Sequence, residues 1–331
     1  MNRREFLERA AVIGATCSPF PARRVFAAID ARVAVVSNTT RAEGVHRAVT
    51  LLGLEPLAGR DGFIKPNFNS ADVTPGSTHN DTLSAVATEL RRMGAGSLTI
   101  GDRSGMGNTR DVMQSKDVFA LARDLKARTI VFDELPDTEW EPVRRPGLHW
   151  SRGFAFPRPV LRAGFIVSTC CLKTHRYGGH FTLSLKNSVG FAAKQVPGDS
   201  HNYMTELHRS ASQRRMIAEI NTAYRPALVV LDAVQGFTTE GPDKGTLVEP
   251  GVVIAGTDRV AVDAVGVALL RLFGTTPEVS RGAVFDQEQI ARAVELGLGV
   301  TSPDAIRLVT DDARSEAMAR RIETALRARP A

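Results

Sequence analysis

Short apolar runs alternate with segments of helical periodicity along most of the 331-residue chain, and this alternation limits the fold more than any other feature. Several runs are rich in Val and Ile, as are strands that are buried on both faces of a parallel sheet. Strands that alternate with helices form a mostly parallel sheet with right-handed crossovers. We therefore predict a Rossmann-like, three-layer α/β fold with helices flanking the sheet. The predicted strands cover residues 32–37, 62–65, 97–101, 128–133, 164–171, 227–232, 251–256 and 305–310.

Two of the intervening helices carry recognisable start or stop signals. In residues 82–94 the apolar positions follow helical spacing, and Gly94 supplies the stop. Residues 258–274 begin with Asp258, which suits an N-cap, and are apolar on most sides, so this helix should be buried. Further helices are predicted over residues 110–126, 204–223, 286–296 and 313–328.

Polar residues follow five of the predicted strands at the point where each strand ends. In open α/β sheets, ligands bind outside the carboxyl ends of the strands. We therefore expect one shared rim, where the strand ends place Lys65, Asp102, Lys173, His175, Asp232 and Asp258, with Asn67 and Arg103 close behind. A polar residue after a strand is common in any protein, so the joint pattern, and no single position, favours a site.

The stretch from residue 164 to 190 (GFIVSTCCLKTHRYGGHFTLSLKNSVG) passes abruptly from a buried strand to cationic and hydrogen-bonding residues. Its second part, residues 181–190, alternates apolar and polar residues, which is typical of a strand. A strand would send Lys186 and Asn187 to opposite faces, whereas a helix or a turn would place them at adjacent positions. We favour the helix or turn, with Lys186 as a point charge for a ligand oxygen and Asn187 as its neutral hydrogen-bonding neighbour.

Three long connections interrupt the pattern of strands and helices. Residues 66–81 form a connection about three times the typical length and have no helical period, which favours a binding loop. Residues 233–245 contain three glycines but match no phosphate-loop spacing. Residues 133–160 hold both tryptophans and are interpreted as a substrate-covering subregion or as an insertion.

Residues 1–27 resemble a twin-arginine export signal. The pair Arg3–Arg4 precedes a Phe-Leu dipeptide and a short, mildly apolar segment, and cleavage is expected before Ala28. An amphipathic first helix with chance arginines is the alternative. On the export interpretation, the partner is the twin-arginine translocation machinery, the protein is periplasmic, and residues 28–331 form a single α/β domain.

The charge of the chain argues against a nucleic-acid partner. Removing residues 1–27 takes away five arginines and two glutamates, so the formal net charge falls from +6 to +3. The remaining charge is small and mixed in sign, unlike that of a nucleic-acid-binding domain. Because no run of about 18 apolar residues occurs, we also expect no stable membrane anchor.

Cys170 and Cys171 are the two cysteines of the expected mature chain. Neighbouring residues of a strand point to opposite faces, so a disulfide between them is not expected, and both are predicted to be small core residues. Two cysteines cannot ligate an iron–sulfur cluster, so we expect no cluster held by this chain alone.

Several of these positions together resemble the domain of unknown function 362 family. The resemblance runs from about Lys65 to Gly299, and its specific part is the Lys-Thr-His and Leu-Lys-Asn-x-x-Gly pair. It is carried by Lys65-Pro66-Asn67, Pro75-Gly76, Gly101-Asp102, Leu172-Lys173-Thr174-His175, Leu185-Lys186-Asn187 with Gly190, Asp232, and Asp258 to Asp263. The resemblance implies an α/β fold and supports these site residues without implying a reaction. Many members carry a ferredoxin-type cysteine cluster, which this chain lacks.

The residues favour an enzyme that acts on a small anionic or carbonyl-bearing molecule by acid/base and electrostatic catalysis. Lysines suit carboxylate, phosphate or enolate oxygens, and His175 is the natural proton shuttle. The predicted catalytic residues are His175, Lys173, Asp102 and Asp232, and the predicted ligand-binding residues are Lys65, Asn67, Lys186, Asn187, Arg103 and Asp258. We expect Lys65, Asp102, Lys173, His175, Lys186, Asn187 and Asp232 to line one pocket. The alternative for each lysine is a structural ion pair with a rim aspartate.

The sequence is also consistent with two other functions. One is a metal- or cofactor-binding accessory protein of a periplasmic redox system, with His175, His180, His201 and His208 as candidate metal ligands. The other is a solute binder without catalysis, which the sequence scarcely separates from the enzyme. The cofactor, if there is one, is not identified by any motif.

Overall fold

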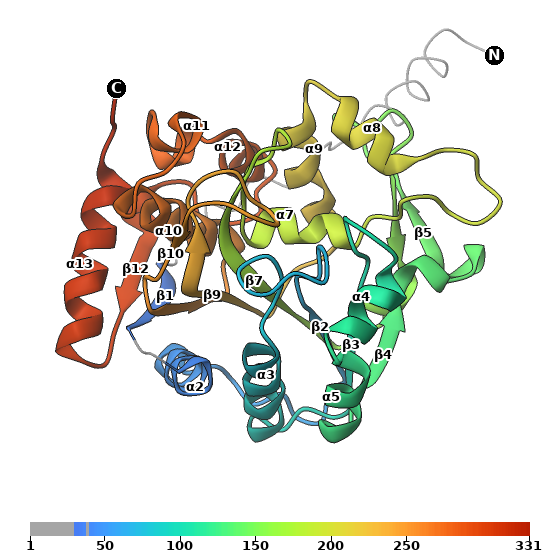
Figure 1. Cartoon of the computed structure of the whole chain (residues 1–331), viewed down its shortest axis with the longest axis horizontal. Helices are drawn as coiled ribbons and strands as arrows, with labels where there is room; N and C mark the ends of the chain where they lie inside the picture. The colour runs from blue at the N-terminus through green and yellow to red at the C-terminus, as the bar shows by residue number, and fades with distance from the viewer. Residues whose placement is uncertain (1–29, 38–39) are drawn as a thin grey trace, which may run out of the picture.

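The computed structural model of the chain describes residues 30–37 and 40–331, and the predicted export signal over residues 1–27 lies outside these residues. A ten-stranded mixed sheet forms the middle layer, with helices on both faces (Figure 1). The α/β fold predicted from the alternating pattern is thus confirmed. Nowhere in the described ranges is a helix both long and apolar enough to cross a lipid bilayer.

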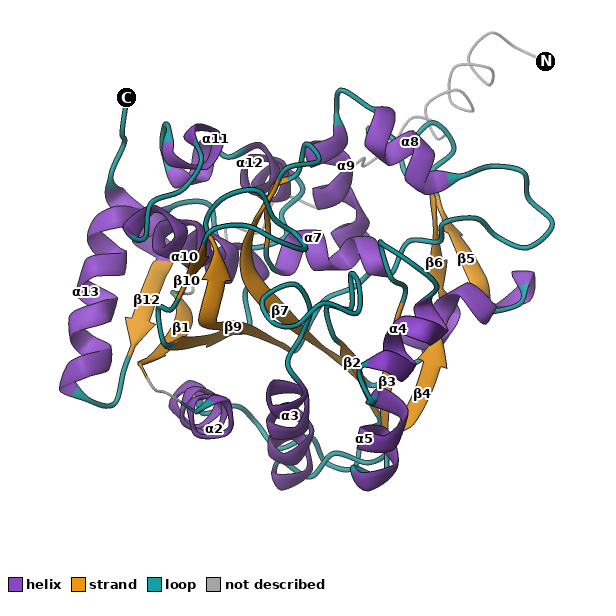
Figure 2. Ribbon diagram, viewed as in Figure 1, coloured by secondary structure: helices purple, strands orange, loops and turns teal. Residues whose placement is uncertain are grey.

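The strands of the main sheet follow the order β12-β1-β11-β9-β7-β2-β3-β4, with β10 beside β9 and β8 beside β7. Strands β5 and β6 form a separate antiparallel pair, which Figure 2 shows apart from the main sheet. The strands are β1 (Ala31–Ser37), β2 (Gly62–Lys65), β3 (Leu98–Asp102), β4 (Arg128–Val131), β5 (Trp140–Val143), β6 (Phe154–Pro157), β7 (Phe165–His175), β8 (His180–Thr182), β9 (Leu228–Phe237), β10 (Leu247–Val248), β11 (Val252–Gly256) and β12 (Ile306–Val309).

Helices α2, α3 and α5 lie on one face of the sheet, and α10 and α13 lie on the other (Figure 1). The helices are α2 (Arg41–Leu52), α3 (Asn80–Arg92), α4 (Thr109–Ser115), α5 (Val118–Asp124), α6 (Arg158–Leu161), α7 (Ser184–Asn187), α8 (Tyr203–Arg209), α9 (Gln213–Ile220), α10 (Arg259–Leu272), α11 (Pro277–Ser280), α12 (Glu288–Glu295) and α13 (Ala313–Arg327).

Two predicted helices are each divided in two. Residues 110–126 form α4 and α5, because Asp117 between them adopts a left-handed conformation with φ of 54°. Residues 204–223 form α8 and α9, because Ser210 is extended. Helix α2 was not predicted, although its buried face does repeat at helical spacing.

The direction of β11 corrects one part of the predicted rim. This strand runs antiparallel to both of its neighbours, β1 and β9, whereas β9, β7, β2, β3 and β4 are parallel to one another. The carboxyl end of β11 therefore lies at the opposite edge of the sheet from the ends of β2, β3 and β7. Asp258, which follows β11, is placed at that opposite edge and not on the shared rim.

Alternate side chains of the strands fill two apolar layers. In β1, Val33 and Val35 face the layer under α10 and α13, and Ala34 and Val36 face the layer under α2 and α3. Burial of each of these valine side chains stabilises the fold by roughly 1.5–3 kcal/mol. The predicted core role of Cys170 and Cys171 is confirmed, since both are free and buried.

A third, aromatic cluster packs beside the site. It joins both tryptophans of residues 133–160 to Phe63, Phe132 and Phe191, with the β5–β6 pair covering it. The ring of Phe191 lies 5.5 Å from the ammonium nitrogen of Lys65. Residues 133–160 thus belong to the aromatic cluster that packs against Lys65. None of them lines the cavity at the site.

Candidate functional site

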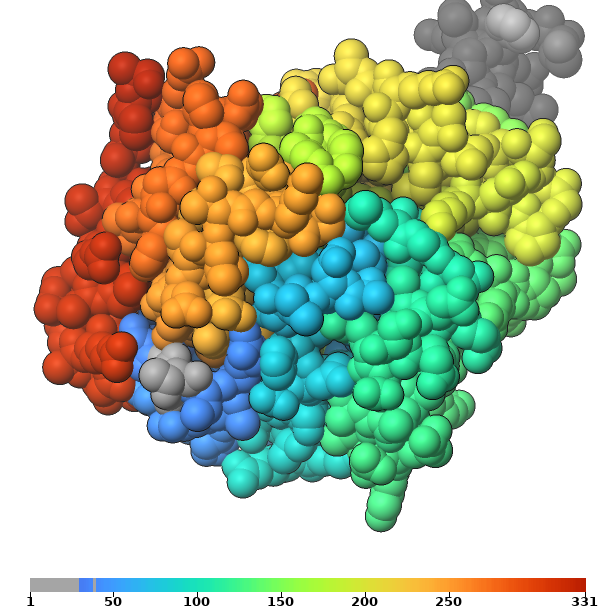
Figure 3. Space-filling model, viewed as in Figure 1, coloured from blue at the N-terminus to red at the C-terminus, as the bar shows by residue number. Residues whose placement is uncertain are grey.

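A cavity of about 40 Å³ opens at the carboxyl ends of β2, β3 and β7. This volume holds about three water molecules, which suits a small anion or a compound of a few carbon atoms and is far below that of a nucleotide site. Its lining residues are Lys65, Asn67, Asn69, Asp102, Arg103, Gly105, Lys173, Thr182, Lys186, Asn187, Val189, Gly190 and Pro242. In Figure 3, segments that are far apart in the sequence meet on the viewed face.

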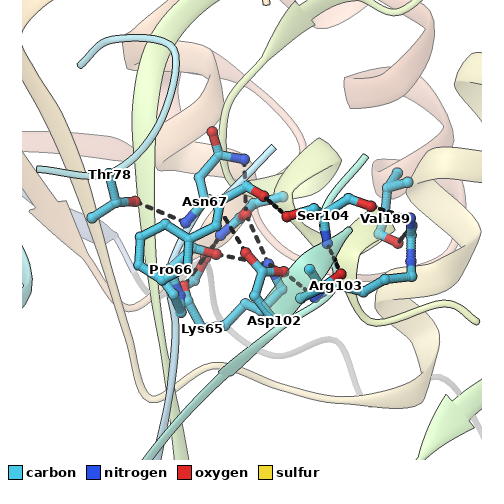
Figure 4. A network of polar contacts seen from close by, with 12 residues as sticks. Lys65, Pro66, Asn67, Thr78, Asp102, Arg103, Ser104 and Val189 are labelled. Atoms are coloured by element: carbon cyan, nitrogen blue, oxygen red, sulfur yellow. Dashed lines mark hydrogen bonds and ion pairs between the residues drawn. The ribbon is translucent and has the colours of Figure 1, made fainter. Parts of the chain in front are cut away.

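One side of the cavity is a closed network around Lys65 and Asp102, which Figure 4 shows from close by. Each of the two side chains is 1% exposed, and the Lys65 Nζ lies 2.6 Å from the Asp102 Oδ1. The same ammonium donates to the Pro66 carbonyl (2.7 Å) and to the Asn187 Oδ1 (3.2 Å). An ammonium has three donors, so Lys65 has none left for a ligand.

Asp102 is equally occupied. Its Oδ2 accepts from the backbone N–H of Phe68, and its Oδ1 accepts from the backbone N–H of Arg103, both at 2.7 Å. Burial raises the pKa of this carboxyl and lowers the pKa of the Lys65 ammonium, and the contact between the two groups opposes both shifts. The pair ties β2, β3 and the loop after β2 together.

The Arg103 guanidinium completes this side. It donates to the carbonyls of Ala192, Ser104 and Val189, and it is 2% exposed. Most of its five donors are therefore used within the protein. Its positive charge still faces the cavity, and this charge is one cause of the lowered pKa of Lys186.

Asn187 lies at the end of α7, so the predicted helix or turn at this point is confirmed. Its amide donates to the Ser168 hydroxyl (2.9 Å) and to the Thr169 carbonyl (3.1 Å), and its Oδ1 accepts from Lys65 and Asn67. The side chain therefore holds the short helix against β7. Lys186, one residue earlier, is free to face another direction.

The glycine that follows this motif has a packing reason. A Cβ on Gly190 would stand 2.5 Å from the Asp102 Oδ1 and 2.6 Å from the Lys65 Nζ. Any side chain here would push the ion pair apart, so the chain can pass over the pair only as glycine.

The opposite side of the cavity holds two cations with few partners. The Lys173 ammonium is fully buried and donates to one acceptor, the Gly76 carbonyl at 2.5 Å. The Lys186 ammonium has no hydrogen bond or ion pair within the described part of the chain. Burial lowers the pKa of Lys173 to about 8. Burial, together with the charges of Lys173 and Arg103, lowers the pKa of Lys186 to about 7.

Three neutral polar atoms of the lining are also unpartnered among the residues that the structure describes. They are the Asn67 Oδ1, the Asn69 Nδ2 and the Thr182 Oγ1, all of them buried. Buried polar groups almost always have a hydrogen-bond partner, and leaving one unpaired costs about 1–3 kcal/mol. Together with Lys173 and Lys186, these atoms provide donors and an acceptor for a bound molecule.

His175 does not line the cavity, contrary to the prediction that it shares the pocket. It lines a neighbouring hollow of about 460 Å³ with Arg176, His180, Glu240 and Glu278. It remains close to Lys186: a Cβ on Gly179 would stand 2.9 Å from the His175 Nδ1 and 2.6 Å from the Lys186 Cε. Burial and the charge of Lys186 hold the pKa of His175 well below its usual range, so the ring is neutral. Its Nδ1 is buried without a partner among the described residues.

Two aspartates predicted for the rim have structural partners elsewhere. The Asp232 Oδ2 lies 2.7 Å from both the Arg41 Nε and the Thr82 Oγ1, so this carboxylate joins β9 to α2 and α3. Asp258 caps α10 by accepting from the backbone N–H groups of Val260 and Ala261. Neither lines the cavity, because Asp232 faces the α2–α3 layer and Asp258 lies at the other edge of the sheet.

Comparison with known proteins identifies the family. A model of the family described as "Domain of unknown function (DUF362)" matches residues 63–268, which is more than half of the chain. The chain belongs to the DUF362 family.

Two individual proteins are also similar to this DUF362 chain. A thylakoid-associated protein of Synechocystis sp. is 26% identical over 237 residues, covering 66% of this chain and 68% of the relative. Among solved structures, the lactate racemase apoprotein from Thermoanaerobacterium thermosaccharolyticum shares 14% identity at a TM-score of 0.44. That match covers 73% of this chain and 56% of the racemase chain.

The histidines proposed as metal ligands in this DUF362 protein are mostly engaged elsewhere. The His201 Nε2 contacts the Glu206 carboxylate at 2.9 Å, and the His208 Nδ1 contacts the Met204 carbonyl at 2.7 Å. His180 lies in the outer hollow beside His175. Within residues 30–37 and 40–331, no three His, Cys, Asp or Glu side chains gather closely enough to hold a metal ion.

Sequence reasoning missed several lining residues. Thr182 stands in an apolar-polar alternation that gives no sign of a cavity, and Val189 and Pro242 carry no polar signal at all. Asn69 follows the same strand as Asn67 and could have been included on that ground. The length of the connection over residues 66–81 was an informative signal, since this loop supplies both asparagines and the Gly76 carbonyl that accepts from Lys173.

Proposed function

We propose that this DUF362 protein is an enzyme that binds a small anionic or carbonyl-bearing molecule in the cavity and acts on it by acid/base and electrostatic catalysis. The observation that carries the proposal is the pair Lys173 and Lys186, which face a small cavity with unused donors. A protein that needed these charges only for stability would have paired them, as it pairs Lys65.

The two lysines suit an anion in different ways. Lys173 is fixed by the Gly76 carbonyl and keeps two donors for a carboxylate or phosphate oxygen. Lys186 is partly exposed and unpartnered, and with a pKa of about 7 it can give or accept a proton near neutral pH. Asp102 is held in its ion pair, so it supports the site and does not act as the base.

The experiment is a thermal-shift screen with small carboxylates, oxo acids and phosphates, followed by turnover assays on the hits. A ligand that binds only the folded state increases the free energy of unfolding by RT ln(1 + [L]/Kd), and it therefore raises the melting temperature. We expect a hit whose shift disappears in Lys186→Met and Lys173→Met. The absence of any such hit contradicts the proposal, and binding without turnover would favour the solute-binder function instead.

A metal-dependent accessory role is tested separately. Elemental analysis of the protein purified from its native host should show no stoichiometric transition metal if the cavity binds anions through its lysines. One metal ion per chain would favour the accessory function over the enzyme.

We also propose export of the folded chain through the twin-arginine pathway to the periplasm. The support is the Arg3–Arg4 pair with the following Phe-Leu and the expected cleavage before Ala28. In a variant with Arg3→Lys and Arg4→Lys, we expect the uncleaved chain to accumulate in the cytoplasm. Unchanged appearance outside the cytoplasm of a chain that starts at Ala28 would contradict this proposal.

A further inference from the structure

The surroundings of Lys186 are those of a reactive lysine, and not only those of a lysine that binds an anion by its charge. Its ammonium is unpartnered among the described residues, its side chain is partly exposed, and it lines the cavity from the end of α7. A Cβ on Gly179 would lie within 3 Å of both the Lys186 Cε and the His175 Nδ1. A neutral imidazole thus lies beside the Lys186 side chain, and any side chain at position 179 would clash with both groups.

We infer that Lys186 is a nucleophile that forms a Schiff base with a small 2- or 3-oxo acid bound in the cavity. This inference rests on the proposed function, because the acid must first bind as an anion. It names the substrate class, an anionic carbonyl compound, and the covalent step.

The cavity provides the contacts that such an acid needs. The carboxylate accepts hydrogen bonds from Lys173, whose ammonium has two donors beyond the Gly76 carbonyl. The unpartnered Asn69 Nδ2 and Thr182 Oγ1 are further donors for the ligand's oxygen atoms. A volume equal to about three water molecules limits the acid to a few carbon atoms.

The reaction needs a neutral amine, and the site favours one. A lysine becomes nucleophilic when it is desolvated or stands beside another cation, and both conditions hold here. Burial, with the charges of Lys173 and Arg103, lowers the pKa of Lys186 to about 7. The groups that shift the pKa of Lys186 or are shifted by its charge are Lys173 and His175 from β7, Arg103 after β3, and His208 from α8. Asp102 also lines the cavity, but its carboxylate is already paired with Lys65 at 2.6 Å.

The step balances without an oxidant or a metal. The lone pair of the Lys186 nitrogen attacks the carbonyl carbon, a C–N bond forms, and the carbonyl electron pair moves to oxygen. The two protons of the amine pass to this oxygen, which leaves as water when the C=N bond forms. His175 is neutral, so one ring nitrogen can accept a proton and the other can donate one. Because His175 lies beside the Lys186 side chain and outside the cavity lining, we assign it the exchange of protons with the amine and not with the ligand.

The test is reductive trapping of the purified protein. Pyruvate, glyoxylate, 2-oxobutyrate and acetoacetate are each incubated with the protein and sodium borohydride, which reduces an imine to a stable secondary amine. Intact-mass and peptide mass spectrometry should show one adduct per chain, located on Lys186, with at least one of these acids. Acetate, which has no carbonyl carbon that can form an imine, should leave no adduct.

Matched variants assign the label. Lys186→Met should reduce labelling to background, and Lys173→Met should weaken it because the carboxylate loses its main contact. Lys244→Met removes an exposed lysine from the loop beside the site and should label like the wild type. Labelling that persists in Lys186→Met, or that spreads over surface lysines, overturns the inference.

Calorimetry with the same acids distinguishes a failure of the Schiff-base inference from a failure of the proposed anion site. If an acid binds in a Lys186-dependent way and yet no adduct forms with any of the four, the Schiff base is wrong and the proposed anion site stands. If none of the four acids binds, the inference is overturned. The proposed function is then decided by the phosphates and other carboxylates of the thermal-shift screen.

Discussion

The two sides of the cavity use the same residue type in opposite ways. On one side, Lys65 gives its three donors to a carbonyl, an amide and the Asp102 carboxylate. On the other side, Lys186 gives its donors to no group in the described ranges. A saturated ammonium stabilises the fold and has no capacity for a ligand, whereas an unsaturated one keeps that capacity at a cost in stability. The comparison distinguishes residues that hold the fold, such as Lys65, from residues that are available to a ligand, such as Lys186.

The largest effect should come from the saturated side. Lys65→Met leaves Asp102 buried without its cation, and removing one partner of a buried pair costs about 3–5 kcal/mol. Chemical denaturation should therefore show a strongly lowered free energy of unfolding. A loss below about 1 kcal/mol, the value typical of a surface pair, would break the comparison.

A second effect tests how α7 holds Lys186 in place. The buried Asp263 of α10 accepts from the backbone N–H groups of Ser184 (2.7 Å) and Leu185 (2.9 Å), which begin this helix. Asp263→Ala leaves both donors unpaired, so we expect a loss of about 1–3 kcal/mol in the free energy of unfolding. Ligand affinity should fall as well, because Lys186 loses its support.

Asp258→Ala is the matched control for this variant. It removes a similar cap from α10, where Asp258 accepts from Val260, Ala261 and Val300, but at the opposite edge of the sheet. We expect a comparable loss of stability with unchanged ligand affinity. Equal losses of affinity in both variants would mean that affinity only follows general stability.

A smaller effect should appear in the pH dependence of anion binding. Lys186 and Lys173, with pKa values of about 7 and about 8, lose their charges as the pH rises through that range. A hydrogen bond to a charged group contributes about 1.5–3 kcal/mol, so the affinity for acetate, whose own charge does not change in this range, should fall by roughly tenfold or more. Titration calorimetry between pH 6 and pH 9 measures this. A flat profile would mean that neither amine contacts the anion.

The smallest effect concerns stability without ligand. The folded-state pKa of Lys186, about 7, lies below its ordinary value of 10.5, so the unfolded chain binds the proton more tightly between these values. The free energy of unfolding should therefore rise with pH in this window. Below about pH 7, Lys186 is charged in the folded state, and the full destabilisation by this charge is present. In Lys186→Met this contribution to the rise should be absent, which melting temperatures across the range would show.

The fold was predictable because strand and helix signals are local. Apolar runs rich in Val and Ile identified the strands of the main sheet, apart from the short β8 and β10, and Asp258 correctly predicted the start of α10. The direction of β11 was not predictable in this way. Residues 251–256 look like any parallel strand, and only the pairing with β1 and β9 shows the reversal.

The site was predictable to the extent that its residues follow parallel strands. Lys65, Asp102 and Lys173 reach one cavity because β2 lies between β3 and β7 and is parallel to both. Asp232 lies within β9, which continues to Phe237, and its carboxylate contacts Arg41 and Thr82 in the opposite layer. Lys65 is saturated because the fold brings the Asn187 amide and the Asp102 carboxylate to it, and no sequence pattern carries that information.

The central claim is that Lys186 faces a ligand while Lys65 holds the fold. The most direct measurement is the melting temperature and the ligand affinity of Lys186→Met, determined on the same preparation. The account predicts an unchanged or slightly raised melting temperature, because a charge without a partner is removed, and a loss of ligand affinity of about tenfold or more. A large drop in melting temperature with retained affinity would contradict the account and assign Lys186 to the scaffold.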